Sequence, residues 1–143
     1  MSADIFIPAR TSGHGQFTVD IDHEKAGWGY SGLRVVELEA GASQALETGD
    51  SELLVLPLAG SATVNVDGRD YELAGRPGVF QAVTDYLYVG RGKELTITSA
   101  AGGRFAFPSA VATQDLPTAY YPKEHVRICL RGAGACSRPV NKY

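Results

Sequence analysis

The sequence has few cysteines, no long apolar run and no excess of positive charge. Its two cysteines, Cys129 and Cys136, have no second pair beside them, which excludes a CxxC zinc knot and a multi-disulfide scaffold; we interpret both as reduced structural thiols. The longest aliphatic run, Leu53 to Leu56, is far shorter than the roughly 20 apolar residues of a membrane-spanning helix. With 13 basic and 16 acidic residues the net charge is −3, which disfavours nucleic acid and membranes as partners.

The chain also lacks helical patterning and a basic leader. No stretch of 11 or more residues keeps the i, i+3, i+4, i+7 apolar spacing, so any helix is expected to be short and peripheral. The first ten residues show no signal-peptide pattern, and we expect a cytoplasmic protein. What the chain does have is 17 glycines and 7 prolines among 143 residues, a turn-rich share that predicts one all-β domain.

Alternation of apolar and polar residues dominates, as in half-buried strands. The clearest case is residues 61–73, where Asp67-Gly68 interrupts the alternation; this dipeptide suits a type I′ turn and predicts a β-hairpin. Pro57 cannot donate a ladder hydrogen bond and should lie at a bulge or an edge. Further strands are expected at residues 17–21, 33–38, 53–58, 85–89, 94–99, 104–108 and 126–130.

Short strands joined by glycine turns and a few long connections predict a double-sheet jelly roll. We assign residues 1–131 to this domain. Residues 132–143 contain few apolar side chains, and we expect an irregular linker tail that leads toward a further domain. Gly90-Arg91-Gly92 is interpreted as a tight turn that needs positive φ, since it lacks the pattern of a phosphate-binding loop.

Four segments carry a resemblance to a known family, from about Trp28 to Asn141: AGWGYSGLRVVELEAGAS, LETGDSELLVLPLAGSATV, VGRGKELTITSAAGGRFAFPSA and LRGAGACSRPVN. They resemble the N-terminal half of the 5-deoxyglucuronate isomerase family, which acts in bacterial myo-inositol catabolism and also holds 5-keto-4-deoxyuronate isomerase. The resemblance implies a cupin-type jelly roll, and a cytoplasmic two-cupin enzyme that interconverts the aldose and ketose forms of a deoxy-uronic acid.

The resemblance also implies where a metal would bind. In members of this family the ligands are two histidines of an HxH motif, a glutamate and a later histidine, and all four lie in the second cupin. The general cupin pattern, G-x5-H-x-H-x3,4-E-x6-G followed by P-x-G-x2-H, can also be laid on this chain. It places Glu47, Gly49, Leu53 and Leu95 at the four ligand positions. We therefore expect no metal ligand, no catalytic residue and no cofactor in this chain, and a divalent metal only in a second cupin.

The three histidines share no short spacing that would suit a metal site. We interpret His14 as a solvated loop residue, His23 as a solvated strand end and His125 as a solvated loop residue.

Because the implied substrate carries a carboxylate, three cations are candidate substrate-binding residues: Arg34, Arg91 and Lys93. Their alternative role is that of solvated surface charges. Trp28 and Tyr30 are expected to anchor the fold or a domain interface, with stacking on a sugar as the alternative.

These expectations lead to three alternative hypotheses about the function of the chain. The first is a metal-free N-terminal cupin of an isomerase, with a structural role: it packs against the second cupin and contributes to a homo-oligomer, is inactive alone, and exposes an apolar patch. The second is a free-standing module that binds a small sugar acid at the barrel mouth. The third is a metal-dependent cupin with unusual ligands, namely Glu47, Glu52 and a histidine.

Overall fold

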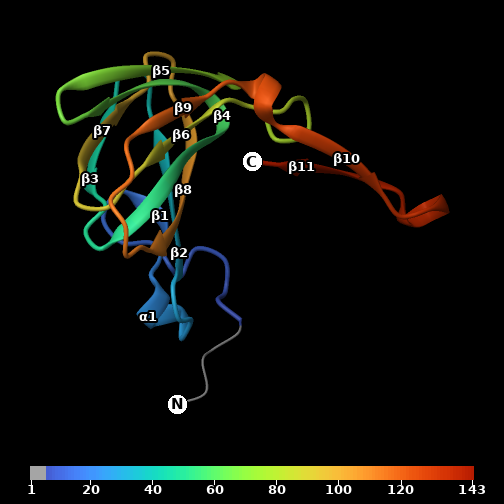
Figure 1. Cartoon of the computed structure of the whole chain (residues 1–143), viewed down its shortest axis with the longest axis horizontal. Coiled ribbons are helices and arrows are strands. Elements are labelled where there is room, and N and C mark those ends of the chain that lie inside the picture. Colours follow the sequence, from blue (N-terminus) through green and yellow to red (C-terminus); the bar gives the residue numbers. More distant parts are fainter. Residues whose placement is uncertain (1–5) are drawn as a thin grey trace.

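The structure is a computed structural model that describes residues 6–143. Its regular structure consists mainly of antiparallel strands, arranged as a two-layered body with a ribbon that projects from it (Figure 1). The strands are β1 Phe17–Ile21, β2 Ser31–Leu38, β3 Ser43–Glu47, β4 Ser51–Val66, β5 Arg69–Arg76, β6 Tyr86–Val89, β7 Glu94–Thr98, β8 Gly103–Val111, β9 Ala119–Tyr121, β10 Arg127–Arg131 and β11 Arg138–Lys142. The helical elements are short: α1 His23–Ala26, η1 Lys123–His125 and η2 Gly134–Cys136.

The two layers of the body are joined through one long strand, β4. In the first layer the strand order is β1-β2-β8-β4-β6-β9. In the second layer β5 and β7 pair with the later part of β4, and β3 pairs with β7. The all-β jelly-roll prediction is confirmed, although the runs expected at residues 53–58 and from residue 61 onward belong to one continuous strand.

The bend in β4 follows from its proline and glycine. The register of β4 against β8 shifts between Pro57 and Ala59, which confirms the predicted bulge. Gly60 follows with a φ of 95°, a conformation open to glycine, and a Cβ there would lie 2.7 Å from the carbonyl oxygen of Gly102. The chain can therefore turn from one layer into the other at this point.

The local turn predictions are confirmed by backbone geometry. Asp67 and Gly68 have φ angles of 49° and 84°, as a type I′ turn requires, and they connect β4 to β5. In the Gly90–Gly92 turn the positive φ lies at Gly92, at 68°. The core between the layers is built from the inward residues of these strands: Val36, Leu53, Val55, Val64, Leu73, Leu87, Ile97, Phe105 and Phe107 are all nearly or completely buried.

The end of the chain differs from the expectation. Residues 132–143 are not irregular: they contain η2 and strand β11, which pairs antiparallel with β10 along its whole length. The sequence pattern missed β11 because its pairing depends on a strand partner and not on local alternation. Its role as a linker to a further domain stays a prediction. No helix in residues 6–143 has the length and apolar character needed to cross a bilayer.

Candidate functional site

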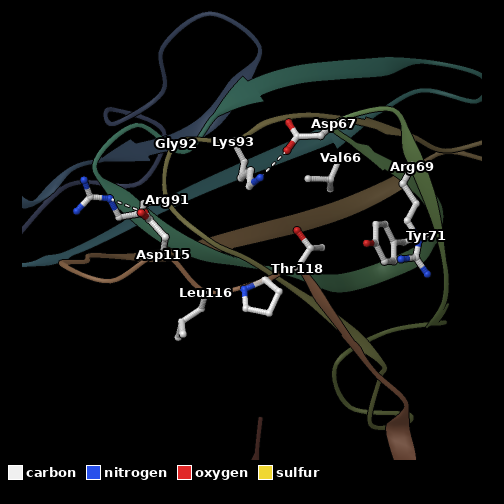
Figure 2. Close-up of a pocket in the computed structure, with 11 residues that line it drawn as sticks. Val66, Asp67, Arg69, Tyr71, Arg91, Gly92, Lys93, Asp115, Leu116 and Thr118 are labelled. Carbon is white, nitrogen blue, oxygen red and sulfur yellow. Dashed lines mark hydrogen bonds and ion pairs between the residues drawn. The ribbon is translucent and has the colours of Figure 1, made fainter.

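A cleft of about 860 Å³ opens between the β4–β5 turn and the loops on either side of Arg91 and Asp115 (Figure 2). The loop that carries Lys93 is held by the buried Thr48. The Thr48 amide donates to the carbonyl oxygen of Lys93 at 2.9 Å, and the Lys93 amide donates to Thr48 Oγ1 at 2.8 Å. The cations of this loop therefore stand at a fixed place on the rim of the cleft.

Two of the predicted cations, Arg91 and Lys93, line this cleft, and both already have carboxylate partners. Arg91 Nε lies 3.2 Å from Asp115 Oδ1, and Arg91 Nη1 donates to the carbonyl oxygen of Ala112 at 2.9 Å. Lys93 Nζ donates to Asp67 Oδ2 at 2.7 Å, and this hydrogen bond raises the pKa of Lys93. Each of the two cations therefore already has an acidic partner.

A third cation of the cleft, Arg69, was missed by the sequence analysis. Its guanidinium carbon lies 5.0 Å from the centre of the Tyr71 ring, a cation–π arrangement. In the described part of the chain no carboxylate oxygen lies within 4.0 Å of Arg69 nitrogens, so it is the least neutralised cation of the cleft. The sequence indicated this place only indirectly. Arg69 directly follows the Asp67-Gly68 turn, and Arg69 and Tyr71, which are two residues apart on β5, lie on the same face of the sheet.

The third predicted cation, Arg34, lies elsewhere. It stands on β2, with its guanidinium 5.4 Å from the Phe17 ring centre and Nη2 donating to the carbonyl oxygen of Glu47 at 3.2 Å. Burial lowers the pKa of Arg34, and Asp20 partly opposes this. It lines a separate cavity of about 250 Å³ together with Tyr30. The three predicted cations therefore do not form one site.

The two aromatic candidates lie on the surface and do not anchor the fold of this chain, which leaves the domain-interface part of the expectation open. Trp28 is 57% exposed and Tyr30 is 68% exposed. They follow α1, whose C-cap Gly27 adopts the left-handed conformation, and the connection carries them to the surface. Their roles at a domain interface or against a sugar stay predictions.

The donors at the cupin ligand positions do not suit a transition metal. Leu53 and Leu95 belong to the core, at 2% and 3% exposure, and Gly49 lies in a turn with a φ of 59°. Glu47 is exposed on β3, whereas the Glu52 carboxylate accepts a hydrogen bond from the Tyr88 hydroxyl. Among residues 6–143, no three His, Cys, Asp or Glu side chains are grouped so that they could hold a metal ion. The structure therefore does not assemble the ligand set of Glu47, Glu52 and a histidine.

The histidines lie in separate surroundings. His14 is exposed, with Nδ1 3.8 Å from Asp20 Oδ2. His23 begins helix α1, so the expected strand end is wrong: Asp22 caps the helix by accepting a hydrogen bond from the Lys25 amide. His125 is exposed in η1, with its ring centre 6.3 Å from that of Tyr121.

The two-layered antiparallel body defines a cupin-like, all-β protein. Residues 5–143 match the model of the KduI/IolB family, and the chain belongs to this family.

The relatives of the chain are considerably longer. It is 27% identical over 139 residues to a 5-deoxy-glucuronate isomerase of Geobacillus kaustophilus, which covers 96% of this chain and 50% of that protein. It is 33% identical over 111 residues to a 4-deoxy-L-threo-5-hexosulose-uronate ketol-isomerase of Escherichia coli O8, and this match covers 73% of this chain and 36% of that protein. An IolB-like protein from Salmonella typhimurium LT2 superposes with a TM-score of 0.83 at 26% identity, over 91% of this chain and 50% of that one. The chain thus spans about half the length of these relatives or less.

Proposed function

We propose that this chain is the N-terminal, metal-free cupin of an isomerase that interconverts the aldose and ketose forms of a deoxy-uronic acid in cytoplasmic myo-inositol catabolism. The observation that carries the proposal is the family match over residues 5–143 of a chain that spans half of a 5-deoxy-glucuronate isomerase. Leucines at two of the four ligand positions support a structural role, because they belong to the core and cannot bind a metal. The chain alone is inactive.

An aldose–ketose isomerisation needs a polarised carbonyl and a base that moves a proton between neighbouring carbons. We assign neither task to the described residues. The second cupin of the longer relatives supplies the chemistry, and this chain supports it by packing against it.

The test compares this chain with a chimaera in which it replaces the N-terminal half of the Geobacillus kaustophilus relative. We expect no isomerisation and a metal content near zero for the chain alone, purified without chelator. The chimaera should isomerise 5-deoxyglucuronate, whereas the C-terminal half of the relative alone should lose most activity. A stoichiometric metal in this chain, or turnover by it alone, would overturn the proposal.

A second function, binding of a sugar acid without catalysis, is favoured by Arg69. Its guanidinium faces the cleft beside an aromatic ring, a combination that suits a carboxylate next to a sugar face. Calorimetry with glucuronate should then give an affinity that Arg69→Ala weakens at least tenfold and Arg91→Ala weakens less. Arg104→Ala is the matched control, because Arg104 pairs with Glu37 away from the cleft. Absence of heat and of a thermal shift would remove this function.

A further inference from the structure

Strands β10 and β11 form a ribbon that leaves the two-layered body (Figure 1, orange to red). They constitute a two-stranded sheet of their own, in which Arg127 pairs with Lys142 and Arg131 with Arg138. We call residues 127–142 the arm. Both end pairs place like charges opposite each other, which destabilises a sheet, and an isolated two-stranded ribbon is marginal in water. The arm on its own is therefore poorly stabilised.

The root of the arm is firmly held. Arg76 is only 7% exposed; its Nη1 donates to the Tyr143 hydroxyl at 2.8 Å and to the carbonyl oxygen of Ala82 at 3.0 Å. The Tyr143 ring also meets the Tyr86 ring edge-on, with 5.8 Å between their centres. These contacts fix the direction in which the arm leaves the body, so a partner need not order its root on binding.

The two faces of the arm differ in chemistry, because side chains alternate along each strand. One face carries the four cations of the arm, which are Arg127, Arg131, Arg138 and Lys142. The opposite face carries Ile128, Leu130 and Pro139. Ile128 is 58% exposed and Leu130 85% exposed, so the apolar face has no cover from residues 6–143. The arm thus presents exposed apolar side chains on one face and positive charges on the other.

The rest of the chain has the opposite charge. Nine of the 13 basic residues and all 16 acidic residues precede Arg127, so this part has a formal charge of −7 and the arm +4. Such charges attract when they lie on two different molecules, and they steer the molecules toward each other. The part of a second copy that precedes its Arg127 therefore carries the negative charge that attracts the positively charged arm.

A matching apolar surface lies on the outer face of the first layer. There a hollow of about 270 Å³ is lined chiefly by Leu54, Tyr88, Pro108 and Ala110. The Glu52 carboxylate lies at this hollow and accepts the hydrogen bond of the Tyr88 hydroxyl. The hollow is thus chiefly apolar, as is the face of the arm that carries Ile128 and Leu130.

From these observations we propose that two copies of this chain exchange arms. Ile128 and Leu130 of each copy pack on the hollow of the other, and the cations on the opposite face of the arm add long-range attraction to the negatively charged body of that copy. Each copy gives and receives the same contact, so the assembly closes as a two-fold dimer. The inference does not rest on the proposed function, because its test measures mass and contact and not turnover.

Light scattering after gel filtration of the whole chain at micromolar concentrations is the first test. The expected mass is twice the 15.2 kDa of one chain. Leu130→Glu should shift dissociation to at least tenfold higher concentration, because it places a carboxylate in the apolar contact. Phe80→Glu is the control: Phe80 is 98% exposed but lies outside the arm and the hollow. Circular dichroism checks that both variants are folded.

The second test identifies the contact surface. Cys136, exposed near the tip of the arm, is labelled with a photo-crosslinker in a Cys129→Ser background, and unlabelled chains enriched in heavy nitrogen are mixed in. Cross-links from light to heavy chains on β4, β6 or β8 are expected. A monomer, a dimer that Leu130→Glu leaves unchanged, or cross-links confined to another face would overturn the proposal; a monomer that binds a second cupin would assign the arm to that partner.

Discussion

At the scale of single residues, the most connected polar group of the body is Asp85, which is 2% exposed. Its carboxylate accepts hydrogen bonds from the amides of Ala74 and Gly75 at 2.8 and 2.9 Å. It also accepts from the hydroxyls of Thr84 and Tyr120 at 3.2 and 2.8 Å. A buried carboxylate is tolerated when donors surround it in this way, and Asp85 thereby ties β5 to β6 and β9.

Replacing Asp85 tests this role. Asp85→Ala should lower the free energy of unfolding by about 3 kcal/mol, because two part-buried amides and two hydroxyls lose their acceptor. Asp85→Asn should cost less, since the side chain keeps one acceptor oxygen. Urea denaturation gives both values, and Glu39→Ala is the exposed control. A loss below about 1 kcal/mol for Asp85→Ala would contradict the assigned role.

The Tyr88 hydroxyl should make stability depend on pH in alkaline solution. Burial, and then the hydrogen bond to the Glu52 carboxylate, raise the pKa of Tyr88 to about 12. In the unfolded chain a tyrosine titrates near about 10, so only the unfolded state loses the proton between these values. The contribution of Tyr88 to stability is therefore complete below about pH 10 and is lost as the pH rises toward 12.

Phenolate absorbance measures this directly. We expect a late-titrating group that Tyr88→Phe removes, together with a smaller loss of stability above about pH 10 than in the parent. Tyr120, whose pKa burial and the hydrogen bond to Asp85 also raise to about 12, accounts for the late titration that remains. Titration of every tyrosine near the ordinary value would contradict the prediction.

At the scale of elements, the fold depends on how closely β4 and β5 approach at the bend. Gly75 of β5 has a φ of 67°, and a Cβ there would lie 1.8 Å from the carbonyl oxygen of Gly60. Gly68 also has a positive φ, at 84°, but a Cβ there would meet no atom within 4 Å. Substitutions at the two glycines therefore distinguish the cost of a left-handed backbone conformation, which both share, from the cost of a steric clash, which only Gly75 would have.

Alanine at each position measures the two effects. Gly68→Ala should lower the free energy of unfolding by about 1–2 kcal/mol, the usual cost of a left-handed residue with a Cβ. Gly75→Ala carries this cost and a backbone clash as well, so we expect a loss of about 4 kcal/mol or more, or failure to fold. Chemical denaturation compares the two, and equal losses would show that β5 can move away from the bend.

At the scale of the whole molecule, charge and apolar surface are distributed unevenly. The body carries all the acidic side chains and a hollowed apolar sheet face, whereas the charged side chains of the arm are all cations and its Ile128 and Leu130 are exposed. The arm projects from the body (Figure 1), so its exposed side chains can reach a second molecule.

The arm exchange makes a thermodynamic prediction for the whole molecule. If the folded dimer is stabilised by mass action, the midpoint of thermal unfolding rises with protein concentration. Calorimetry over a hundredfold concentration range should show this rise in the parent and in Phe80→Glu, and should show it lost or reduced in Leu130→Glu. A midpoint independent of concentration in the parent would contradict the dimer.

Short-range chemistry was predictable from the sequence. Asp67-Gly68 fixed a turn type, Pro57 demanded a bulge, and the alternation of apolar residues placed most strands, because each of these depends on neighbouring residues alone. The resemblance to the family, carried by contiguous segments, was likewise present in the sequence and is confirmed by the family match.

What only the tertiary structure decided depends on residues far apart in the chain. It brought Arg69 to the same cleft as Arg91 and Lys93, and separated Arg34 from them, because strands distant in sequence pair at a register that no local pattern contains. It also turned the expected tail into β11, because a strand with weak alternation forms once β10 supplies its hydrogen bonds. Local residue types thus determined the elements of this protein, and pairing between distant strands determined its surfaces.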